Sequence, residues 1–240
     1  MGVSLPNPLG GRPALVTGAS RENSIGAAVA ARLRADGAAV LVHGWRDGPA
    51  DLELDLGDAD APASLVAQAR ERLGGQLDIV VAAHADPMPG ELADVTAAEL
   101  DRAWAVNARA SVLLAQALAA GRDPAQPGGR VVLFTSGQHI QGMPAEVPYA
   151  VSKGAIHGMT RTLAAALAPR SITVNTINPG PVDTGWPDEE LRERLRPAFP
   201  AGRWGRPEDI APVVAFLCSD GAAWLTGNVL DAEGGFRREA

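Results

Sequence analysis

Short apolar segments alternate with longer segments of helical periodicity along almost the whole chain of 240 residues. Six mainly apolar runs are expected to be strands, and a seventh strand is expected near the end: residues 14–17, 39–42, 52–56, 79–83, 131–134, 172–177 and 228–231. Strands that are apolar at nearly every position are typical of a parallel sheet covered by helices on both faces. We therefore expect an α/β fold with a single doubly wound parallel sheet and right-handed crossovers.

The segments between these strands carry apolar residues at the spacing that is typical of helices. Helices are expected at residues 24–36, 64–73, 96–120, 149–168 and 207–218. The segment Thr96-Ala97-Ala98-Glu99 has the pattern of a capping box, which favours a helix start at Thr96. No linker and no internal repeat interrupts the alternation, so residues 1–240 are expected to form one domain.

Composition excludes several classes of protein. A formal net charge of −7 argues against a nucleic-acid-binding protein, which needs a basic face. The single cysteine, Cys218, excludes an internal disulfide and a cysteine metal cluster, which fits a reducing cytoplasm. The histidines His43, His84, His139 and His157 lack the spacing of metal ligands, so no metal site is predicted. No apolar stretch approaches the roughly 20 residues that span a membrane, and the first residues do not resemble a signal peptide. We expect a cytoplasmic protein that binds neither membranes nor nucleic acid.

The only tyrosine and the only lysine of the chain, Tyr149 and Lys153, lie four positions apart. Residues at positions i and i+4 share one face of a helix, so both side chains are able to point at the same bound group. A lysine ammonium close to a phenol favours the phenolate and lowers its pKa, which brings it towards the range useful for proton transfer. The alternative is an ordinary pair on a helix surface, since a coding bias explains why both residue types are rare.

Ser136 and Asn107 favour the interpretation of Tyr149 and Lys153 as a catalytic pair. Ser136 follows the strand at residues 131–134, where its hydroxyl is able to donate a hydrogen bond to a substrate oxygen while Tyr149 delivers a proton. Asn107 is a polar residue among apolar ones in a predicted helix, and its side chain is able to hold a water that leads to Lys153. The alternatives are a turn residue for Ser136 and a satisfied buried amide for Asn107.

The turn after the first strand, residues 17–26, is a candidate phosphate-binding turn. Ligands of doubly wound sheets bind beyond the carboxyl ends of the strands, where this turn is expected to lie. Gly18 permits a tight turn, and residues 24–26 would present the N–H groups of a helix N-terminus to a pyrophosphate. A glycine-bearing turn between strand and helix is also common for purely structural reasons.

The end of the second strand bears on the choice of nucleotide. An NAD site usually has an acidic residue there for the ribose hydroxyls, but His43-Gly44-Trp45-Arg46 contains none. Arg21 and Arg46 are able to bind a 2′-phosphate through paired N–H donors, which favours NADP(H), with NAD(H) as the alternative. Solvent-exposed surface arginines are the other interpretation of this pair.

The end of the sixth strand and the segment after it are candidates for contacts with a nicotinamide and a substrate. Asn178-Pro179-Gly180-Pro181 forms a stiff backbone that is able to lie along a nicotinamide ring, although a rigid turn explains it equally well. Residues 182–199, which include Trp186, are expected to fold over a substrate as a lid. His139 and Met143 are candidate substrate contacts, or else parts of a surface loop.

With these residues in place, the chain resembles a short-chain dehydrogenase/reductase over about residues 12–236. The resemblance is carried by the spacing of Ser136, Tyr149 and Lys153 and by three segments: Val174–Thr184, Arg203–Ile210 and Leu225–Asn228. Among the members of this family, the chain is most similar to the 3-oxoacyl-[acyl-carrier-protein] reductases. The resemblance implies a Rossmann-type fold and an oxidoreductase that interconverts a ketone and a secondary alcohol with NADP(H).

The resemblance also implies roles for single residues. Tyr149 is the general acid/base, Ser136 positions the substrate carbonyl, Lys153 binds the nicotinamide ribose and lowers the pKa of the tyrosine, and Asn107 completes a proton relay. The cofactor-binding residues predicted from the motifs and the resemblance together are Gly18, Ser20, Arg21, Ser24, Ile25, Arg46, Asp55, Leu56, Ala83, Tyr149, Lys153, Pro179, Gly180, Val182 and Thr184. Asp55 is expected near the adenine and Thr184 near the carboxamide. A homotetramer or homodimer is expected through the helices that begin near Thr96 and Tyr149.

The chain departs from the family pattern in the glycine turn and after the fourth strand. The turn is two residues longer than usual, around Asn23 and Ser24, and the usual Asn-Asn-Ala-Gly reads Ala82-Ala83-His84-Ala85. The second departure puts in question the hydrogen bonds that usually steady this strand. Neither departure changes Ser136, Tyr149, Lys153 or Asn107, so an active enzyme is expected. The alternative function is a dinucleotide-binding protein of the same fold without catalysis; a sugar-nucleotide epimerase fits poorly, because the C-terminal part is short.

Overall fold

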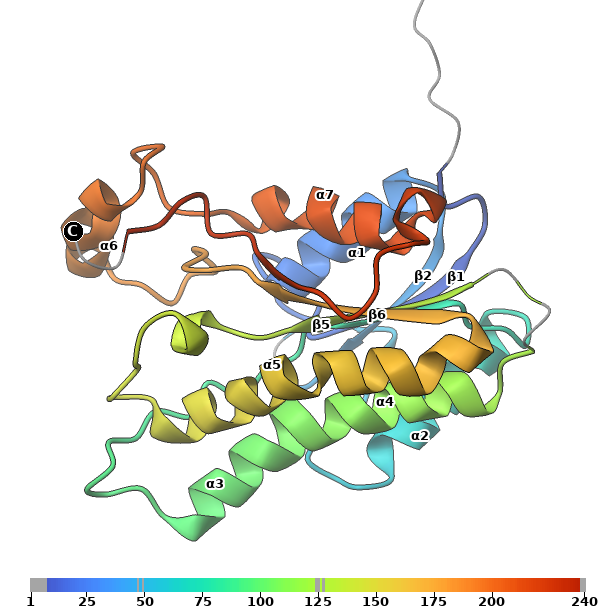
Figure 1. Ribbon diagram of the computed structural model, residues 1–240, viewed down its shortest axis with the longest axis horizontal. Helices are drawn as coiled ribbons and strands as arrows, with labels where there is room; N and C mark the ends of the chain where they lie inside the picture. The colour runs from blue at the N-terminus through green and yellow to red at the C-terminus, as the bar shows by residue number, and fades with distance from the viewer. Residues whose placement is uncertain (1–7, 47, 49, 124–125, 127, 238–240) are drawn as a thin grey trace, which may run out of the picture.

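A computed structural model describes residues 8–46, 48, 50–123, 126 and 128–237. All strands of the central sheet are parallel, in the order β3-β2-β1-β4-β5-β6-β7 (Figure 1). The strands are β1 (Pro13–Thr17), β2 (Ala39–Gly44), β3 (Leu52–Glu53), β4 (Ile79–Ala82), β5 (Gly129–Phe134), β6 (Ile172–Asn178) and β7 (Val229–Asp231). The α-helices are α1 (Ile25–Ala35), α2 (Ala61–Arg72), α3 (Ala97–Ala103), α4 (Ala110–Ala120), α5 (Val147–Leu167), α6 (Glu189–Leu195) and α7 (Pro207–Cys218).

The sheet order places a topological switch point between β1 and β4. From β1 the chain first builds outward through β2 and β3, and it then returns to add β4 on the other side of β1. The crossovers therefore leave in opposite directions, which opens a crevice beyond the carboxyl ends of β1 and β4. Gly18 and Ala83 follow these two strand ends, so both lie at the edge of the sheet where such folds bind ligands.

Helices cover both faces of the sheet, with α1 and α7 on one side and α2, α4 and α5 on the other (Figure 1). Successive residues of a strand point to opposite faces, and β4 shows the result directly. Val80 and Ala82 pack into the core beneath α2, α4 and α5, whereas Ile79 and Val81 pack into the core beneath α1 and α7. Because both faces are buried, the strands are apolar at nearly every position, as the sequence predicts.

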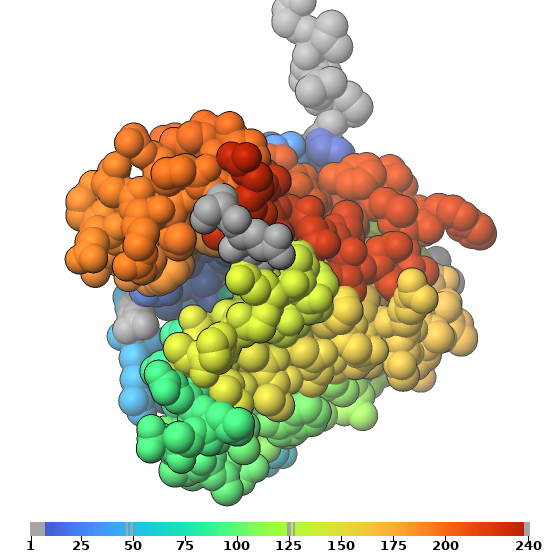
Figure 2. Space-filling view, turned by 60° about the vertical axis from the view of Figure 1, so that its left-hand side comes forward, coloured from blue at the N-terminus to red at the C-terminus, as the bar shows by residue number. Residues whose placement is uncertain are grey.

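The segment that we call the lid, residues 182–199, stands beyond the carboxyl edge of the sheet and contains α6 (Figure 1). Its base is held by an aromatic cluster, in which the Trp204 ring lies 5.6 Å from that of Trp186 and 5.3 Å from that of Phe199. The Trp204 indole also donates to the Arg192 carbonyl over 3.0 Å. Figure 2 shows a hollow beneath this orange segment, with blue N-terminal residues at its floor and the yellow-green loop after β5 on its other side.

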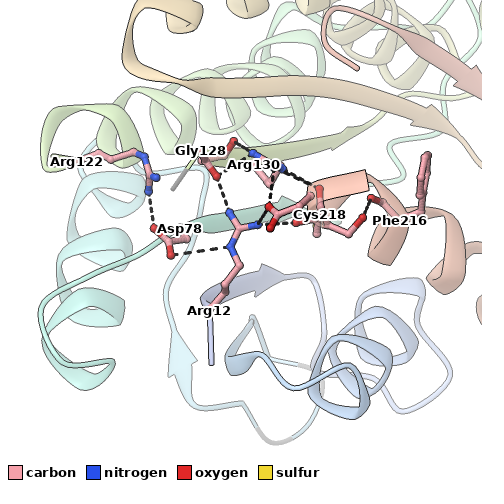
Figure 3. Close-up of polar contacts among 10 residues, drawn as sticks. Arg12, Asp78, Arg122, Gly128, Arg130, Phe216 and Cys218 are labelled. Carbon is pink, nitrogen blue, oxygen red and sulfur yellow. Dashed lines mark hydrogen bonds and ion pairs between the residues drawn. The ribbon is translucent and has the colours of Figure 1, made fainter. Parts of the chain in front are cut away.

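The opposite edge of the sheet is closed by buried arginines (Figure 3). Arg12 and Arg130 both donate to the Gly128 carbonyl, and Arg12 reaches the Cys218 carbonyl over 2.9 Å. Asp78 pairs with Arg122 and lies 4.0 Å from Arg12. These contacts join the start of β1, the approach to β5 and the end of α7, so this cluster has a structural role away from the ligand edge.

The predicted α/β fold is confirmed, with differences at the ends and interiors of elements. The capping box of Thr96 and Glu99 is present, but the helix predicted for residues 96–120 contains a π-helical turn at Trp104–Arg109 between α3 and α4. The third strand ends at Glu53 rather than at residue 56, since the Asp55 carboxylate accepts the Gly57 amide and turns the chain.

Two other elements differ from the prediction as well. α2 begins at Ala61 rather than at residue 64, after Asp60. The lid contains α6, which the sequence analysis did not predict, although its cap, Asp188, accepts the Leu191 amide over 2.8 Å. Among the described residues, no helix combines the length and the apolar character that crossing a bilayer requires.

Candidate active site

Lys153 is joined to the end of β5 at both its side chain and its backbone. Its ammonium donates to the Phe134 carbonyl over 3.0 Å, and its own carbonyl accepts the Thr135 hydroxyl over 2.8 Å. The side chain lies in the interior and only 2 % of the residue is exposed. These two hydrogen bonds set the position of α5 along β5, and they thereby place Ser136, the next residue of the chain, beside the same helix.

Tyr149 lies one turn before Lys153 on α5, as the spacing predicts. The Lys153 nitrogen is 5.6 Å from the centre of the phenol ring. The Ser136 side chain lies beside the phenol of Tyr149 and acts to lower its pKa. Ser136, Tyr149 and Lys153 are therefore brought together at the carboxyl edge of the sheet, and both Ser136 and Tyr149 keep part of their surface accessible.

Burial shifts the pKa values of both Tyr149 and Lys153. The shift of the tyrosine is opposite in direction to the one that the sequence predicts. Burial and, to a smaller extent, the Glu146 carboxylate raise the pKa of Tyr149 to about 12, although Ser136 acts to lower it. Burial likewise lowers the pKa of Lys153 to about 7. The predicted lowering of the tyrosine pKa by Lys153 is thus wrong for this structure, because desolvation of the phenolate dominates and Lys153 is not among the groups that shift this pKa. At neutral pH the phenol is a proton donor.

Asn107 is buried in the π-helical turn, and its side chain is hydrogen-bonded to three groups of the protein. Its amide nitrogen donates to Ser152 Oγ over 2.9 Å and to the Asp86 carbonyl over 3.1 Å, and its oxygen accepts the Asp86 amide over 2.7 Å. Ser152 in turn donates to the Tyr149 carbonyl over 2.8 Å. Asn107 therefore positions α5 through Ser152 and orders the segment after β4.

His84 makes hydrogen bonds just after β4, where the departure from the family pattern put the usual ones in question. Its Nε2 lies 2.9 Å from the Val106 carbonyl, which only accepts, so Nε2 carries the proton. Its Nδ1 then accepts the Thr17 hydroxyl over 2.6 Å. Burial, with smaller contributions from Lys153 and His43, lowers the pKa of His84 to about 3, so the ring stays neutral. This one side chain joins β1, the end of β4 and the π-helical turn.

The glycine turn forms a tight cradle between β1 and α1. Gly18 has φ +70°, and a Cβ atom there would lie 2.6 Å from the backbone of His84. A Cβ atom on Gly26 would lie 2.4 Å from the Gly18 carbonyl oxygen. Ser24 caps α1 by accepting the Ala27 amide over 3.0 Å, and the first N–H groups of a helix, here those of Ile25 and Gly26, have no partner within it. Such a turn fits a pyrophosphate.

The predicted residues for the adenosine half lie around the end of β2 and of β3. Arg46 and Arg21 are exposed, and Arg46 has φ +65° with its guanidinium 4.8 Å from the centre of the Trp45 ring. The Asp55 carboxylate pairs with Arg102 over 3.1 Å. Asp47, the first acidic residue after β2, lies outside the described residues.

Three other predicted cofactor contacts, Leu56, Ser20 and Ala83, line this side of the crevice in different ways. Leu56 is 3 % exposed and packs in the core, so only its backbone is able to face a ligand. A Cβ atom on Gly44 would lie 2.3 Å from the Ser20 Cβ, which shows that Ser20 packs against the end of β2. Ala83 is half-buried beside the glycine turn.

The predicted nicotinamide contacts follow β6. Asn178 donates to Asp231 over 2.9 Å and to Glu233 over 2.7 Å, which holds the turn before Pro179 and Gly180. Gly180 has φ +62°, a conformation that favours glycine.

Val182 and Thr184 continue from this turn into the lid. The Val182 side chain is buried at 4 % exposure, so a contact with a ligand would have to come from its backbone. Thr184 is half-buried at the base of the lid.

The predicted substrate residues lie on the loop after β5 and on the lid. Met143 Sδ is 4.0 Å from the Ser136 hydroxyl. His139 is bound to the Ser136 carbonyl and to Asp231, each over 3.1 Å, so it orders the loop that carries Ser136. Trp186 donates to the Val182 carbonyl over 2.9 Å and stays 57 % exposed. In the part of the chain that the structure describes, no group of three or more His, Cys, Asp or Glu side chains is arranged to hold a metal ion.

Comparison with known proteins agrees with this geometry. The family described as enoyl-(acyl carrier protein) reductase matches residues 18–237. The uncharacterized oxidoreductase YjdA of Bacillus subtilis is 37 % identical, over 94 % of this chain and 96 % of its own length. A crystal structure of a short-chain dehydrogenase from Burkholderia cenocepacia in complex with NADP has a TM-score of 0.85 at 33 % identity, and it covers 95 % of this chain and 98 % of that one. The chain belongs to the short-chain dehydrogenase/reductase family.

A second solved structure extends this comparison. The reductase LugOII, described as promiscuous and as catalysing keto-reduction at C1 during lugdunomycin biosynthesis, has a TM-score of 0.84 at 36 % identity. The match covers 95 % of this chain and 98 % of that one. As a short-chain dehydrogenase/reductase, the chain is an NAD(P)-dependent oxidoreductase with a Rossmann-type sheet.

Sequence reasoning missed three side chains that shape this short-chain dehydrogenase/reductase site. Ser152 lies between the two members of the Tyr149–Lys153 pair, and its position on the buried side of the helix was the available signal. His84 was noted only as a departure. Asn23 was noted only as part of a longer turn, although it reaches the lid. Each acts through a partner distant in sequence.

The buried Lys153 predicts a pH dependence of stability. Its pKa is about 7 in the folded protein against 10.5 for the ordinary group, so the unfolded chain binds more protons between these values. The free energy of unfolding should therefore rise with pH from 7 towards 10, by up to about 1.4 kcal/mol per pH unit. Urea unfolding of the wild type and of Lys153→Met, compared between pH 7 and 9.5, checks this. A difference between the two proteins that does not change with pH would contradict it.

Proposed function

We propose that this protein interconverts a ketone and a secondary alcohol, with Tyr149 as the general acid/base. The observation that carries the proposal is the placement of Ser136 beside the phenol of Tyr149, at a partly accessible position on the ligand edge of the sheet. A substrate carbonyl oxygen placed between these two hydroxyl groups would contact two O–H donors. Ser136 then orients the oxygen and Tyr149 gives it a proton, while the buried Lys153 fixes the position of the helix.

A nicotinamide dinucleotide, when bound, supplies the hydride for reduction or accepts it in the reverse direction. The cradle of Gly18 and Gly26 and the free N–H groups at the start of α1 fit its pyrophosphate. We assign Ser20, Ser24 and Ile25 to this half of the cofactor and Asp55, Leu56 and Ala83 to the adenosine. Pro179, Gly180, Val182 and Thr184 are assigned to the nicotinamide half, where Lys153 and Tyr149 face the ribose.

We propose further that NADP(H) is preferred over NAD(H). Exposed Arg46 and Arg21 provide two guanidinium groups for a 2′-phosphate. The described end of β2 carries no acidic side chain to bind free ribose hydroxyls. The NADP complex of the Burkholderia cenocepacia relative supports this choice.

The substrate class that we propose is a ketone, and among ketones a 3-oxoacyl group. Keto-reduction by LugOII supports the first part. The loop after Ser136 carries Met143, whose Sδ is 4.0 Å from the Ser136 hydroxyl, and the exposed Ile140, and both favour an apolar substituent next to the carbonyl. Trp186 on the lid adds a third apolar surface.

Replacement of Tyr149 by Phe tests the chemical role. The variant keeps the ring and removes the phenol proton, so turnover of ketones should fall by at least about a hundredfold, in line with the contribution of general acid catalysis. Binding of NADP(H), followed by fluorescence titration, should change little. Val151→Ala on the exposed side of the same helix is the control, and it should keep its activity.

The outcome of that comparison separates the candidate functions. Unchanged turnover in Tyr149→Phe would contradict the proposed role of Tyr149. Saturable NADP(H) binding by the wild type, without any oxidation or reduction across ketones, alcohols and enoyl thioesters, would instead favour the non-catalytic dinucleotide-binding protein.

Replacement of Arg46 by Ala tests the choice of nucleotide. Loss of a charge-assisted hydrogen bond to a phosphate weakens binding by about tenfold or more. The Kd for NADPH should therefore rise by about tenfold, whereas the Kd for NADH should stay within about twofold. Arg161→Ala, at an exposed arginine on α5, is the matched control. Equal loss of affinity for NADPH and NADH in Arg46→Ala would contradict the assignment.

A further inference from the structure

The longer glycine turn reaches across the crevice to the lid. Asn23, which immediately precedes the cap of α1, donates from its side-chain amide to the Thr184 carbonyl over 2.7 Å. The turn itself is closed by a hydrogen bond of 3.0 Å from the Ser24 amide to the Arg21 carbonyl. Asn23 lies where this turn is two residues longer than is usual for its motif. The added length thus brings a donor to a segment that is 161 positions away in the chain.

The Thr184 carbonyl, which accepts the hydrogen bond from Asn23, lies in a turn that is fixed by several contacts. Asp183 donates its amide to the Gly205 carbonyl over 2.9 Å, and its carboxylate accepts the Gly185 amide over 2.9 Å. Arg192 of α6 binds the same carboxylate over 2.9 Å. A Cβ atom on Gly185 would lie 2.7 Å from the Asn23 amide nitrogen, and Gly185 has φ +85°. The Thr184 carbonyl is therefore fixed in a turn that leaves room for Asn23.

The hydrogen bond closes a ring around the proposed cofactor site. One side of the ring is the glycine turn and the start of α1, and the other is the end of β6 and the start of the lid, residues 178–185. Figure 2 shows the lid over the hollow that has N-terminal residues at its floor. The bridge thus joins the two segments to which we assign the pyrophosphate and the nicotinamide half of the cofactor.

We propose that Asn23 is a positioning residue that clasps the lid to the start of α1, so that the cofactor enters and leaves only when this hydrogen bond opens. This inference rests on the proposed dinucleotide site. Because Asn23 and Thr184 are both accessible to water, the bond exchanges readily with water hydrogen bonds. Its loss should therefore change the rates of cofactor exchange more than the stability of the fold.

Stopped-flow fluorescence of NADPH bound to Asn23→Ala tests the clasp. The dissociation rate constant should rise about fivefold relative to the wild type, as expected for one lost hydrogen bond. The association rate constant should rise as well, and the melting temperature without cofactor should stay within about 2 °C. Glu22→Ala is the matched control, since Glu22 lies in the same exposed turn and makes no hydrogen bond to the lid within the described residues.

A second measurement needs no cofactor. Trypsin cleaves after arginine unless proline follows, and the lid carries two such sites, Arg192 and Arg194. Cleavage within the lid should be faster in Asn23→Ala than in the wild type or in Glu22→Ala, because the clasp no longer restrains the start of the lid.

The outcomes distinguish this inference from the proposed function. If the wild type binds neither NADP(H) nor NAD(H), the proposed function fails and the clasp fails with it. If the wild type binds NADPH but the dissociation rate constant of Asn23→Ala stays within twofold, only the clasp is overturned. An equal rise in Glu22→Ala would also overturn it, since the effect would then belong to the turn as a whole.

Discussion

The two hydrogen bonds between Lys153 and the end of β5 organise this site. They connect the ammonium to the Phe134 carbonyl and the Thr135 hydroxyl to the Lys153 carbonyl, so α5 has one position along the sheet. Tyr149, one turn away on α5, is thereby placed beside Ser136. The ammonium is buried with one carbonyl partner among the described residues, and its pKa falls accordingly. The site thus retains a desolvated lysine that a purely structural helix would have no reason to keep.

A second set of buried polar contacts fixes the site from the side of the glycine turn. His84 joins Thr17 to Val106, and Asn107, the next residue, joins Ser152 to the segment after β4. The π-helical turn brings Val106 and Asn107 to these partners within one wide helical turn. The π-helical turn therefore links the glycine turn, through His84, to the helix that carries Tyr149, through Ser152, in one hydrogen-bonded network. Fully paired networks of this kind hold a unique arrangement, because an unpaired buried group is costly.

Sequence reasoning recovered the features that depend on local pattern. The apolar strands, the capping box at Thr96 and the i,i+4 spacing of Tyr149 and Lys153 are all local, and the structure contains each of them. The features that it missed depend on contacts between distant segments. The π-helical turn has no spacing signature, and the partners of His84 and Asn23 lie on other elements. The direction of the Tyr149 pKa shift was missed for the same reason, since desolvation depends on what packs around the phenol.

Whether Tyr149 is held as a neutral proton donor is tested most directly by its own ionisation. It is the only tyrosine of the chain, so the absorbance of phenolate in the folded protein reports on this residue alone. Titration of the cofactor-free protein should show a pKa well above the ordinary 10.0, at about 12. Ser136→Ala should raise it further, because the serine hydroxyl that favours the phenolate is lost. Half-ionisation of the folded wild-type protein at or below pH 10, or an unchanged titration in Ser136→Ala, would contradict the desolvated phenol beside Ser136 on which the proposed reaction depends.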